Sequence, residues 1–311
     1  MKEADLLIIG GSAAGLSAGL FAARRGLKSL IVTKDLGGQL ASTLDISNYP
    51  GISFIEGYSL AEIMAEQARR AGAQIVTDEI SALEATGGER RSFIARGTQN
   101  SYVGRALIIA LGKTPRSLGL PAEEKYLGRG VGYCSPAEIN AAAGQHVVII
   151  GGGGTAFAAA KLGATIAEHV TLVHRNETFR AEQSVVDDVR KLPNVTIMTN
   201  TQVTALHGDS VLSEVTVVTP HDTIKLKCDF LLIGAGFTVR PEMYEHLVHT
   251  NELGLITVNE RQETSRPGVY AAGDICSVPF NQAVISAGEG AKAALSAYTW
   301  LTGKPAGSDW G

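Results

Sequence analysis

A strand, a glycine-rich turn, a helix and a second strand follow one another twice in this chain of 311 residues. The first copy runs from the apolar residues 6–9 to residues 29–32, and the second from residues 147–150 to residues 170–173. In both copies 23 positions separate the first glycine of the turn from the residue after the second strand, namely Gly10 from Thr33 and Gly151 from His174. Short apolar runs that alternate with helices predict parallel strands in an α/β fold.

Each turn has the small residues that a dinucleotide site requires. They let the backbone turn sharply and approach a pyrophosphate, which the N–H groups and the dipole of the helix N-terminus attract. One such turn also closes ordinary strand–helix connections, but two in register favour a pair of dinucleotide sites. Ser12 stands where the first motif usually has its middle glycine. The expected contacts are Gly10, Ser12, Ala13 and Gly15 in the first turn, and Gly151, Gly153, Gly154, Thr155 and Ala156 in the second.

The residue after the second strand distinguishes the nucleotides. An NAD site has Asp or Glu there for the ribose 2′-hydroxyl, whereas a basic residue suits a 2′-phosphate. The second copy has His174 and Arg175 at this place and Arg180 shortly after. Because arginine forms charge-assisted bonds with phosphate, the pattern favours NADPH over NADH. The alternative is that both arginines are ordinary solvated surface residues.

A third motif, residues 264–274, indicates what the first unit binds. It is a turn and a strand that end at Gly273 and Asp274, and a helix is expected from Ala283 to about Trp300. A carboxylate at such a strand end can accept hydrogen bonds from the ribitol hydroxyls of a flavin, and N–H groups at the helix start can polarise its pyrimidine carbonyl. This interpretation predicts FAD in the first unit. The alternative is that Asp274 only caps the helix.

Composition excludes several other classes of function. The 27 Lys and Arg residues against 31 Asp and Glu residues give a formal charge of −4, too small to attract nucleic acid or anionic lipid by bulk charge. We expect neither a signal peptide nor a membrane span, because no apolar run approaches the roughly 18 residues that a span needs. Three widely spaced cysteines fit reduced thiols in the cytoplasm. His246 and His249 would share a helix face without a further ligand, so we expect no metal site.

Further motifs make the chain resemble the low-molecular-weight thioredoxin reductase family along nearly its whole length. They are Gly37-Gly38-Gln39-Leu40, Asn48-Tyr49-Pro50-Gly51, an expected strand over residues 107–112, Gly128-Arg129-Gly130-Val131, Phe179-Arg180-Ala181-Glu182, Gly273-Asp274 and Gln282-Ala283. The resemblance implies two Rossmann-like α/β domains of the three-layer ββα type. An FAD domain, residues 1–113 and 242–311, would be interrupted by an NADPH domain, residues 114–241. The resemblance also implies a homodimer.

The resemblance further assigns the residues that hold FAD. Beyond the first turn, they lie at the end of the second strand, in the loop motifs, after the 107–112 strand and in the third motif. These residues are Thr33, Lys34, Gln39, Leu40, Asn48, Gly112, Asp274, Gln282 and Ala283. Trp310 would stack on the flavin, as an aromatic residue does in some related ferredoxin reductases; the alternative is a disordered tail.

The active-site motif departs from the family pattern. The family has Cys-x-x-Cys-Asp 17 residues before the second glycine-rich turn, and here the segment reads Cys134-Ser135-Pro136-Ala137-Glu138. In the family the second cysteine receives electrons from the flavin, and the first attacks the protein substrate by thiol–disulfide exchange. With alanine at position 137 this motif has no disulfide to reduce, so thioredoxin reductase activity should be absent or very poor. Cys134 and Glu138 remain the candidate catalytic residues.

We therefore predict an FAD-dependent oxidoreductase that passes electrons from NADPH through FAD to an external acceptor: ferredoxin or flavodoxin, a quinone or dioxygen. One alternative is a disulfide reductase in which Cys134 pairs with an atypical second thiol, for which Cys276 is the candidate. Cys228, in a probable strand over residues 225–233, is expected to be a small buried residue. It also remains open whether Cys134 has any role.

Another alternative is a flavin-binding protein that is non-catalytic or is reduced by ferredoxin. It follows from a second departure, because Gly154, Ala158 and Ala159 stand where family members commonly have polar residues that help to seat the nicotinamide.

Overall fold

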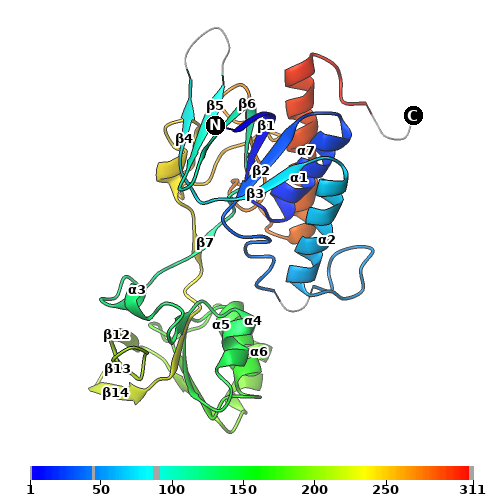
Figure 1. Cartoon of the computed structure of the whole chain (residues 1–311). Helices are drawn as coiled ribbons and strands as arrows, with labels where there is room; N and C mark the ends of the chain where they lie inside the picture. Colours follow the sequence, from blue (N-terminus) through cyan, green and yellow to red (C-terminus); the bar gives the residue numbers. More distant parts are fainter. Residues whose placement is uncertain (1, 44–45, 87–91, 308–311) are drawn as a thin grey trace. The chain divides into compact units, whose positions relative to one another are not determined.

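The computed structural model describes residues 2–43, 46–86 and 92–307 and divides the chain into two compact units (Figure 1). Unit 1 consists of Met1–Thr114 and Val239–Gly311, and unit 2 consists of Pro115–Thr238. The chain therefore leaves unit 1, builds all of unit 2 and returns. The connecting segments contain two short strands that pair with each other, β7 (Thr114–Pro115) and β16 (Phe237–Thr238). Trp310 lies outside the described residues.

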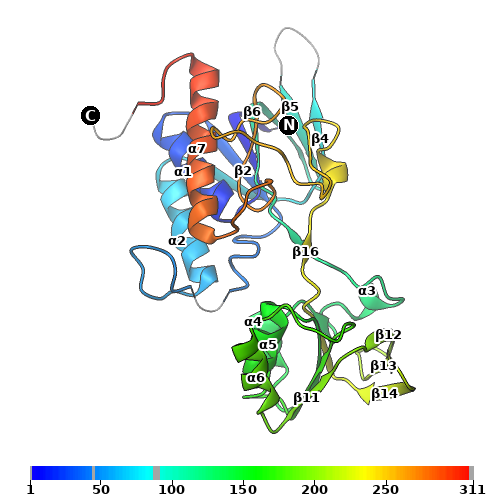
Figure 2. The same cartoon turned by 180° about the vertical axis from the view of Figure 1, so that it is seen from behind.

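Unit 1 is built on a seven-stranded sheet in the order β3-β2-β1-β6-β5-β4, with β17 also paired to β6. Strands β1, β2, β3, β6 and β17 are parallel, and β4 and β5 form an antiparallel hairpin that continues the sheet from β6. Three helices gather on one face of the sheet in both views (Figures 1 and 2). The elements are β1 (Lys2–Ile9), α1 (Ala13–Arg24), β2 (Ser29–Thr33), α2 (Gly57–Arg70), β3 (Gln74–Thr77), β4 (Ile80–Ala85), β5 (Phe93–Gly97), β6 (Ser101–Ile109), the 3-10 helix η1 (Pro241–Met243), β17 (Val269–Ala271) and α7 (Ala283–Thr302).

Alternate residues of β1 supply two separate hydrophobic cores. Leu6 and Ile8 belong to the core that includes residues of α1, α2 and α7. Leu7 and Ile9 belong to the other, which includes residues between 239 and 278. Because both faces of β1 are covered, its sequence is a continuous apolar run rather than an alternating one.

Unit 2 has the three layers that the resemblance implies. A parallel sheet in the order β11-β10-β9-β15-β8 forms its centre. Helices α4, α5 and α6 cover one face, and the antiparallel sheet β12-β13-β14 covers the other (Figures 1 and 2). The elements are α3 (Glu123–Tyr126), β8 (Val131–Gly132), α4 (Pro136–Ala141), β9 (His146–Ile150), α5 (Gly154–Gly163), β10 (His169–Val173), α6 (Gln183–Arg190), β11 (Val195–Met198), β12 (Gln202–His207), β13 (Glu214–Val218), β14 (Thr223–Lys227) and β15 (Phe230–Ile233).

Two expected strands differ in the structure. The single strand expected over residues 225–233 is wrong, because β14 ends at Lys227 in the antiparallel sheet and β15 begins at Phe230 in the parallel one. Cys228 lies in the short connection between β14 and β15 and is fully buried, as expected. The strand expected to reach Gly112 ends at Ile109, and Gly112 has a φ of +62°, which an extended strand cannot accommodate.

A buried carboxylate fixes the turn between β5 and β6. Asp78 is 2% exposed and accepts hydrogen bonds from Thr98 Oγ1 at 2.7 Å and Tyr102 OH at 2.8 Å. The backbone N–H groups of Gln99 and Asn100 also donate to it. Burial raises the pKa of Asp78, but these hydrogen bonds to the charged form outweigh it and lower the pKa from 3.8 to about 2.

Asp78→Asn is expected to lower the free energy of unfolding by about 1–3 kcal/mol at pH 7, because the amide leaves buried donors without an acceptor. The folded-state pKa lies below the unfolded value, so the stabilisation is present above pH 4 and is lost as the pH falls towards 2. Urea unfolding of both proteins from pH 7 to pH 2.5 measures the difference. Glu260→Gln, at an exposed position, is the control. A difference that stays constant over this range would contradict the assignment.

Candidate functional site

The first glycine-rich turn joins β1 to α1 with no room for larger residues. Gly10 has a φ of +118°, and a Cβ at Gly10 would overlap the carbonyl oxygen of Ala110. A Cβ at Gly15 would overlap the carbonyl oxygen of Gly10. Ser12 is the N-cap residue of α1, and its side chain makes no capping hydrogen bond. The start of α1 therefore offers backbone N–H groups, with neither a side-chain cap nor an acidic residue in the first turn, as a pyrophosphate site requires.

The end of β2 lies beside this turn. Thr33 is buried, and its hydroxyl donates to the carbonyl oxygen of Asp35. A Cβ at Gly11 would lie 2.7 Å from Thr33 side-chain atoms, so this glycine is also required by packing. Lys34 is exposed and forms an ion pair of 3.0 Å with Glu79. Of these two predicted FAD residues, Thr33 packs against the turn, and Lys34 is an exposed charged residue directly after Thr33.

The predicted flavin residues come from three separate segments of unit 1 that hydrogen bonds join. Gln39 Nε2 donates to the carbonyl oxygen of Lys113 at 2.8 Å, directly after Gly112. Asn48 Nδ2 donates to Gln282 Oε1 at 3.0 Å. The remaining predicted residues lie on the same segments: Leu40 is buried, and Ala283 is the first residue of α7. The structure therefore brings together loops that are far apart in the sequence.

Asp274 does not cap α7. The N-cap residue of that helix is Gln282, which makes no capping hydrogen bond with its side chain. Asn281 Nδ2 donates to Asp274 Oδ1 at 3.2 Å, and Ser286 Oγ donates to the same oxygen at 3.4 Å. Among the described residues both bonds reach Oδ1, which leaves Oδ2 able to accept from a ligand hydroxyl. This donor and acceptor set fits the ribitol and pyrimidine ends of a flavin.

Sequence reasoning missed the buried Glu289. Its carboxylate accepts a hydrogen bond of 2.8 Å from the backbone N–H of Gly273, so it fixes the turn that carries Asp274. Burial raises the pKa of Glu289, against the lowering effect of that bond. The neighbouring Gly290 lets α7 cross α1, because a Cβ there would overlap the carbonyl oxygen of Ala14. The sequence signal that could have pointed to Glu289 is that it is the one acidic residue of α7, between two glycines.

The second glycine-rich turn is tight at its first half and open at its second. A Cβ at Gly151 would lie 2.5 Å from the carbonyl oxygen of Gly234 and 2.7 Å from the Cβ of the buried Ala156. No atom lies within 4 Å of a Cβ built at Gly153 or Gly154. Gly153 is the N-cap of α5, which has no side-chain cap; α5 begins at Gly154 and continues with the exposed Thr155. This helix start also fits a phosphate.

The basic residues predicted for NADPH differ in their surroundings. His174 is only 8% exposed, and a Cβ at Gly152 would overlap its ring. Its Nε2 lies 3.1 Å from the carbonyl oxygen of Thr178, so the imidazole supports the turn from inside. Arg175 and Arg180 are exposed. The backbone N–H of Arg180 donates to the carbonyl oxygen of Gly152 at 2.7 Å, which holds this residue beside the turn.

The candidate catalytic thiol is buried. Cys134 is 8% exposed, is not in a disulfide and has a φ of +60°. Burial, assisted by the charge of Glu138, raises the pKa of this thiol from 9.0 to about 12. Cys276 is fully buried in the core of unit 1, and burial raises its pKa as well. Neither thiol has the exposure or the low pKa typical of a reactive cysteine.

Glu138 is the third residue of α4 and takes part in the N-terminal capping of that helix, whose N-cap residue is Ser135. Its carboxylate accepts hydrogen bonds from the N–H of Tyr133 at 3.0 Å and from the N–H and Oγ of Ser135 at 2.9 and 2.7 Å. Together with the bond from its own N–H to Ser135 Oγ, this is a capping box. A Cβ at Gly132 would overlap the same carboxylate. The structure thus gives Glu138 a local structural role.

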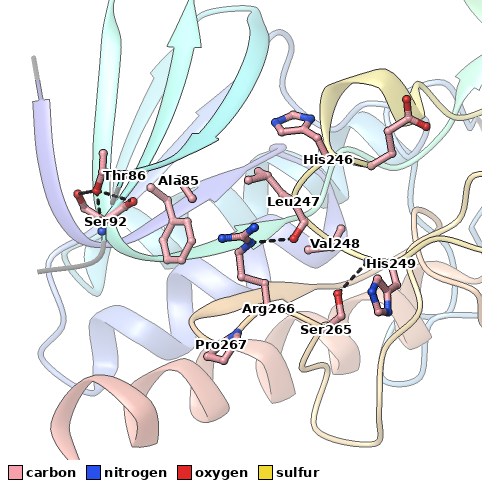
Figure 3. Close-up of a pocket in the computed structure, with 12 residues that line it drawn as sticks. Ala85, Thr86, Ser92, His246, Leu247, Val248, His249, Ser265, Arg266 and Pro267 are labelled. Carbon is pink, nitrogen blue, oxygen red and sulfur yellow. Dashed lines mark hydrogen bonds between the residues drawn. The ribbon is translucent and has the colours of Figure 1, made fainter. Parts of the chain in front are cut away.

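A cavity of about 620 Å³ lies elsewhere in unit 1, beside the end of the β4–β5 hairpin (Figure 3). None of the predicted FAD residues lines it. Its polar groups are largely paired with one another: Arg266 Nε donates to Leu247 O, His249 N donates to Ser265 Oγ, and the hydroxyls of Thr86 and Ser92 lie 2.8 Å apart. Several of the polar groups that line the cavity in the described part of the chain are therefore already engaged with one another.

The helix expected to carry His246 and His249 is wrong. The 3-10 helix η1 ends at Met243, and both histidines lie in the turns that follow it (Figure 3). His246 Nε2 lies 2.7 Å from the carbonyl oxygen of Leu83, which ties this segment to β4. Tyr244, Leu247 and Val248 of this segment pack into the core of unit 1, whereas His246 is exposed.

A family model described as Pyridine nucleotide-disulphide oxidoreductase matches residues 4–290. The chain belongs to this family. It is 33% identical over 303 residues to the thioredoxin reductase of Treponema pallidum (strain Nichols), covering 96% of this chain and 97% of that protein. The solved thioredoxin reductase of Lactococcus lactis (FR conformation) has a TM-score of 0.84 and 28% identity, covering 97% and 100% of the two chains. A ferredoxin-flavin thioredoxin reductase of Clostridium acetobutylicum has a TM-score of 0.54 and 27% identity, covering 98% and 100%.

Family membership confirms the predicted fold class, cofactors and enzyme class. The protein is a thioredoxin reductase-like NAD(P)H-dependent FAD oxidoreductase with a two-domain Rossmann-like fold, and members of the family bind FAD and NADPH. No helix in the described part of the chain is long and apolar enough to cross a membrane. Within the same residues, no group of three or more His, Cys, Asp or Glu side chains is arranged to hold a metal ion.

Proposed function

We propose that this protein passes electrons from NADPH through FAD to an acceptor outside the chain, without an internal dithiol. The observation that carries the proposal is the state of Cys134, which is the single cysteine of its motif and is buried, with its pKa raised to about 12. The thiolate is the nucleophile of thiol–disulfide exchange, so a thiol that stays protonated at neutral pH is a poor relay. Electrons must then leave by a route that uses no cysteine of this motif.

We assign FAD to unit 1 and NADPH to unit 2. The start of α1 would bind the FAD pyrophosphate, Asp274 Oδ2 would accept from the ribitol, and the backbone at Gln282 and Ala283 would donate to the pyrimidine carbonyl. In unit 2 the start of α5 would bind the NADPH pyrophosphate, and Arg175 and Arg180 would bind the 2′-phosphate. Bound FAD would supply the conversion between two-electron and one-electron transfer.

A second candidate is that a reduced ferredoxin, rather than NADPH, supplies the electrons. It is supported by the open space beside Gly153 and Gly154, and by Gly154, Ala158 and Ala159 at positions where family members commonly have polar residues. It is also supported by the similarity to the Clostridium acetobutylicum ferredoxin-flavin thioredoxin reductase.

Anaerobic reduction distinguishes the two candidates. We expect NADPH to bleach the bound flavin at least about tenfold faster than NADH at equal concentration, since the 2′-phosphate gains charge-assisted bonds. Ferricyanide, ferredoxin, flavodoxin, a quinone and dioxygen are then tested separately for reoxidation by stopped-flow absorbance. A flavin that stays oxidised with NADPH but is bleached by reduced ferredoxin would overturn the first candidate and support the second.

We further propose that the protein works as a homodimer in the cytoplasm. The family resemblance supports the dimer, and the three free cysteines fit a reducing compartment.

A further inference from the structure

Lys113, which belongs to none of the predicted site residues, forms hydrogen bonds with residues of the predicted flavin site in unit 1. Lys113 Nζ donates to Asn281 Oδ1 at 3.2 Å, and Asn281 Nδ2 donates in turn to Asp274 Oδ1. The side chain of Gln39 fixes the backbone of the same lysine, because its Nε2 donates to the Lys113 carbonyl oxygen at 2.8 Å. Lys113 is thus held at both its backbone and its ammonium group.

The position of this ammonium group follows from its neighbours. Asn281 immediately precedes Gln282 and Ala283, which begin α7 and which we assign to the pyrimidine ring of the flavin. Gly112, with a φ of +62°, directs the chain out of β6 just before the lysine. The ammonium therefore lies at the end of the site where the ring system binds, and not at the pyrophosphate end beside Gly15.

Among the described residues, no carboxylate oxygen forms an ion pair with this ammonium group, and the group that accepts its hydrogen bond is a neutral amide. The amide takes its own orientation from Asp274: Asn281 Nδ2 faces the carboxylate, so its Oδ1 faces the lysine. In the described part of the chain the ammonium group is therefore separated from the Asp274 carboxylate by the Asn281 amide and forms no direct ion pair. A fixed positive charge next to a group that gains electrons stabilises the reduced state of that group.

We propose that Lys113 is a positioning residue that sets the redox potential of the flavin, with Asn281 holding its ammonium group towards the pyrimidine end of the ring system. The proposal rests on the assignment of FAD to unit 1 and needs no particular donor or acceptor. It adds a determinant of electron flow in a protein whose flavin has no dithiol partner in the motif at Cys134. A more positive midpoint potential favours reduction of the flavin by the electron donor.

The test is the midpoint potential of the bound flavin, measured by equilibration with a reference dye during chemical reduction. Lys113→Met is expected to lower the ratio of reduced to oxidised flavin about tenfold at a fixed potential, which for a two-electron couple is about 30 mV more negative. Lys113→Arg, which keeps the charge, should stay within threefold of the unmodified protein. Lys28→Met removes an exposed ammonium of the same unit and controls for bulk charge.

An unchanged potential in Lys113→Met, or an equal shift in Lys28→Met, would overturn the proposal. If Lys113→Met does not retain flavin, Asn281→Ala decides, because it releases the ammonium group without removing it: a more negative potential supports the proposal and an unchanged one refutes it. Neither NADPH nor an acceptor takes part in this measurement. The midpoint potential can therefore be interpreted even if the proposed electron route is wrong.

Discussion

Thioredoxin and small aromatic disulfides are expected to be reduced at least about 1,000-fold more slowly than by a reductase whose relay thiol has an ordinary pKa, whereas the same preparation should reduce ferricyanide readily. A thiol whose pKa is about 12 holds about 1,000-fold less thiolate at neutral pH than one with the ordinary value of 9.0. Cys134 also has no cysteine partner at position 137. The measurement is the turnover of each acceptor with NADPH, or with a chemical reductant if NADPH does not reduce the flavin.

Two variants make this result decisive. Cys134→Ser should leave ferricyanide reduction within twofold, whereas brisk thioredoxin turnover that disappears in Cys134→Ser would show that this thiol is the relay after all. Ala137→Cys restores the spacing of the family motif. It should gain a long-wavelength charge-transfer band between thiolate and flavin on two-electron reduction, and a folded variant without that band would contradict the placement of the motif.

The sequence predicted the parts of this structure that depend on local chemistry. Gly10, Gly15 and Gly151 were expected in the turns that follow a strand. An added Cβ would crowd the backbone of a neighbouring segment at Gly10 and Gly151, and the backbone of Gly10 itself at Gly15. Such requirements are visible in sequence because a close backbone approach tolerates only glycine. The three-layer arrangement of the domains was predicted from the family resemblance and not from any single residue.

The surroundings of side chains with partners far away in the sequence could not be predicted. His174 is predicted to help hold NADPH, and the structure adds that its ring is buried against Gly152. Glu138 was a candidate catalytic acid, and it accepts three hydrogen bonds within a capping box. Lys113 was missed because its partner Asn281 is 168 positions away in the sequence. Spacing along a chain does not report such contacts, and only the fold brings them together.

Loss of Arg175 and Arg180 together should abolish most of the preference for NADPH. Each arginine would contribute about one charge-assisted contact to a 2′-phosphate, and removing one such contact costs about tenfold in affinity at an exposed site. Because Arg175 and Arg180 would share one phosphate, their effects need not add, and we expect Arg175→Ala with Arg180→Ala to raise the KM for NADPH by between about tenfold and about 100-fold, with the KM for NADH within threefold. Steady-state reduction of ferricyanide with each coenzyme measures both values.

The structure makes this double variant informative, because neither arginine supports the fold through its side chain in the way that His174 does. Arg180 is held by its backbone N–H, which alanine retains. Arg129→Ala, at an exposed position of unit 2 outside the predicted NADPH residues, is the matched control for the loss of a cation from this unit. If the KM for NADPH rises equally in the control, bulk charge accounts for the effect. If it changes in none of the variants, the two arginines are solvated surface residues and the coenzyme is selected elsewhere.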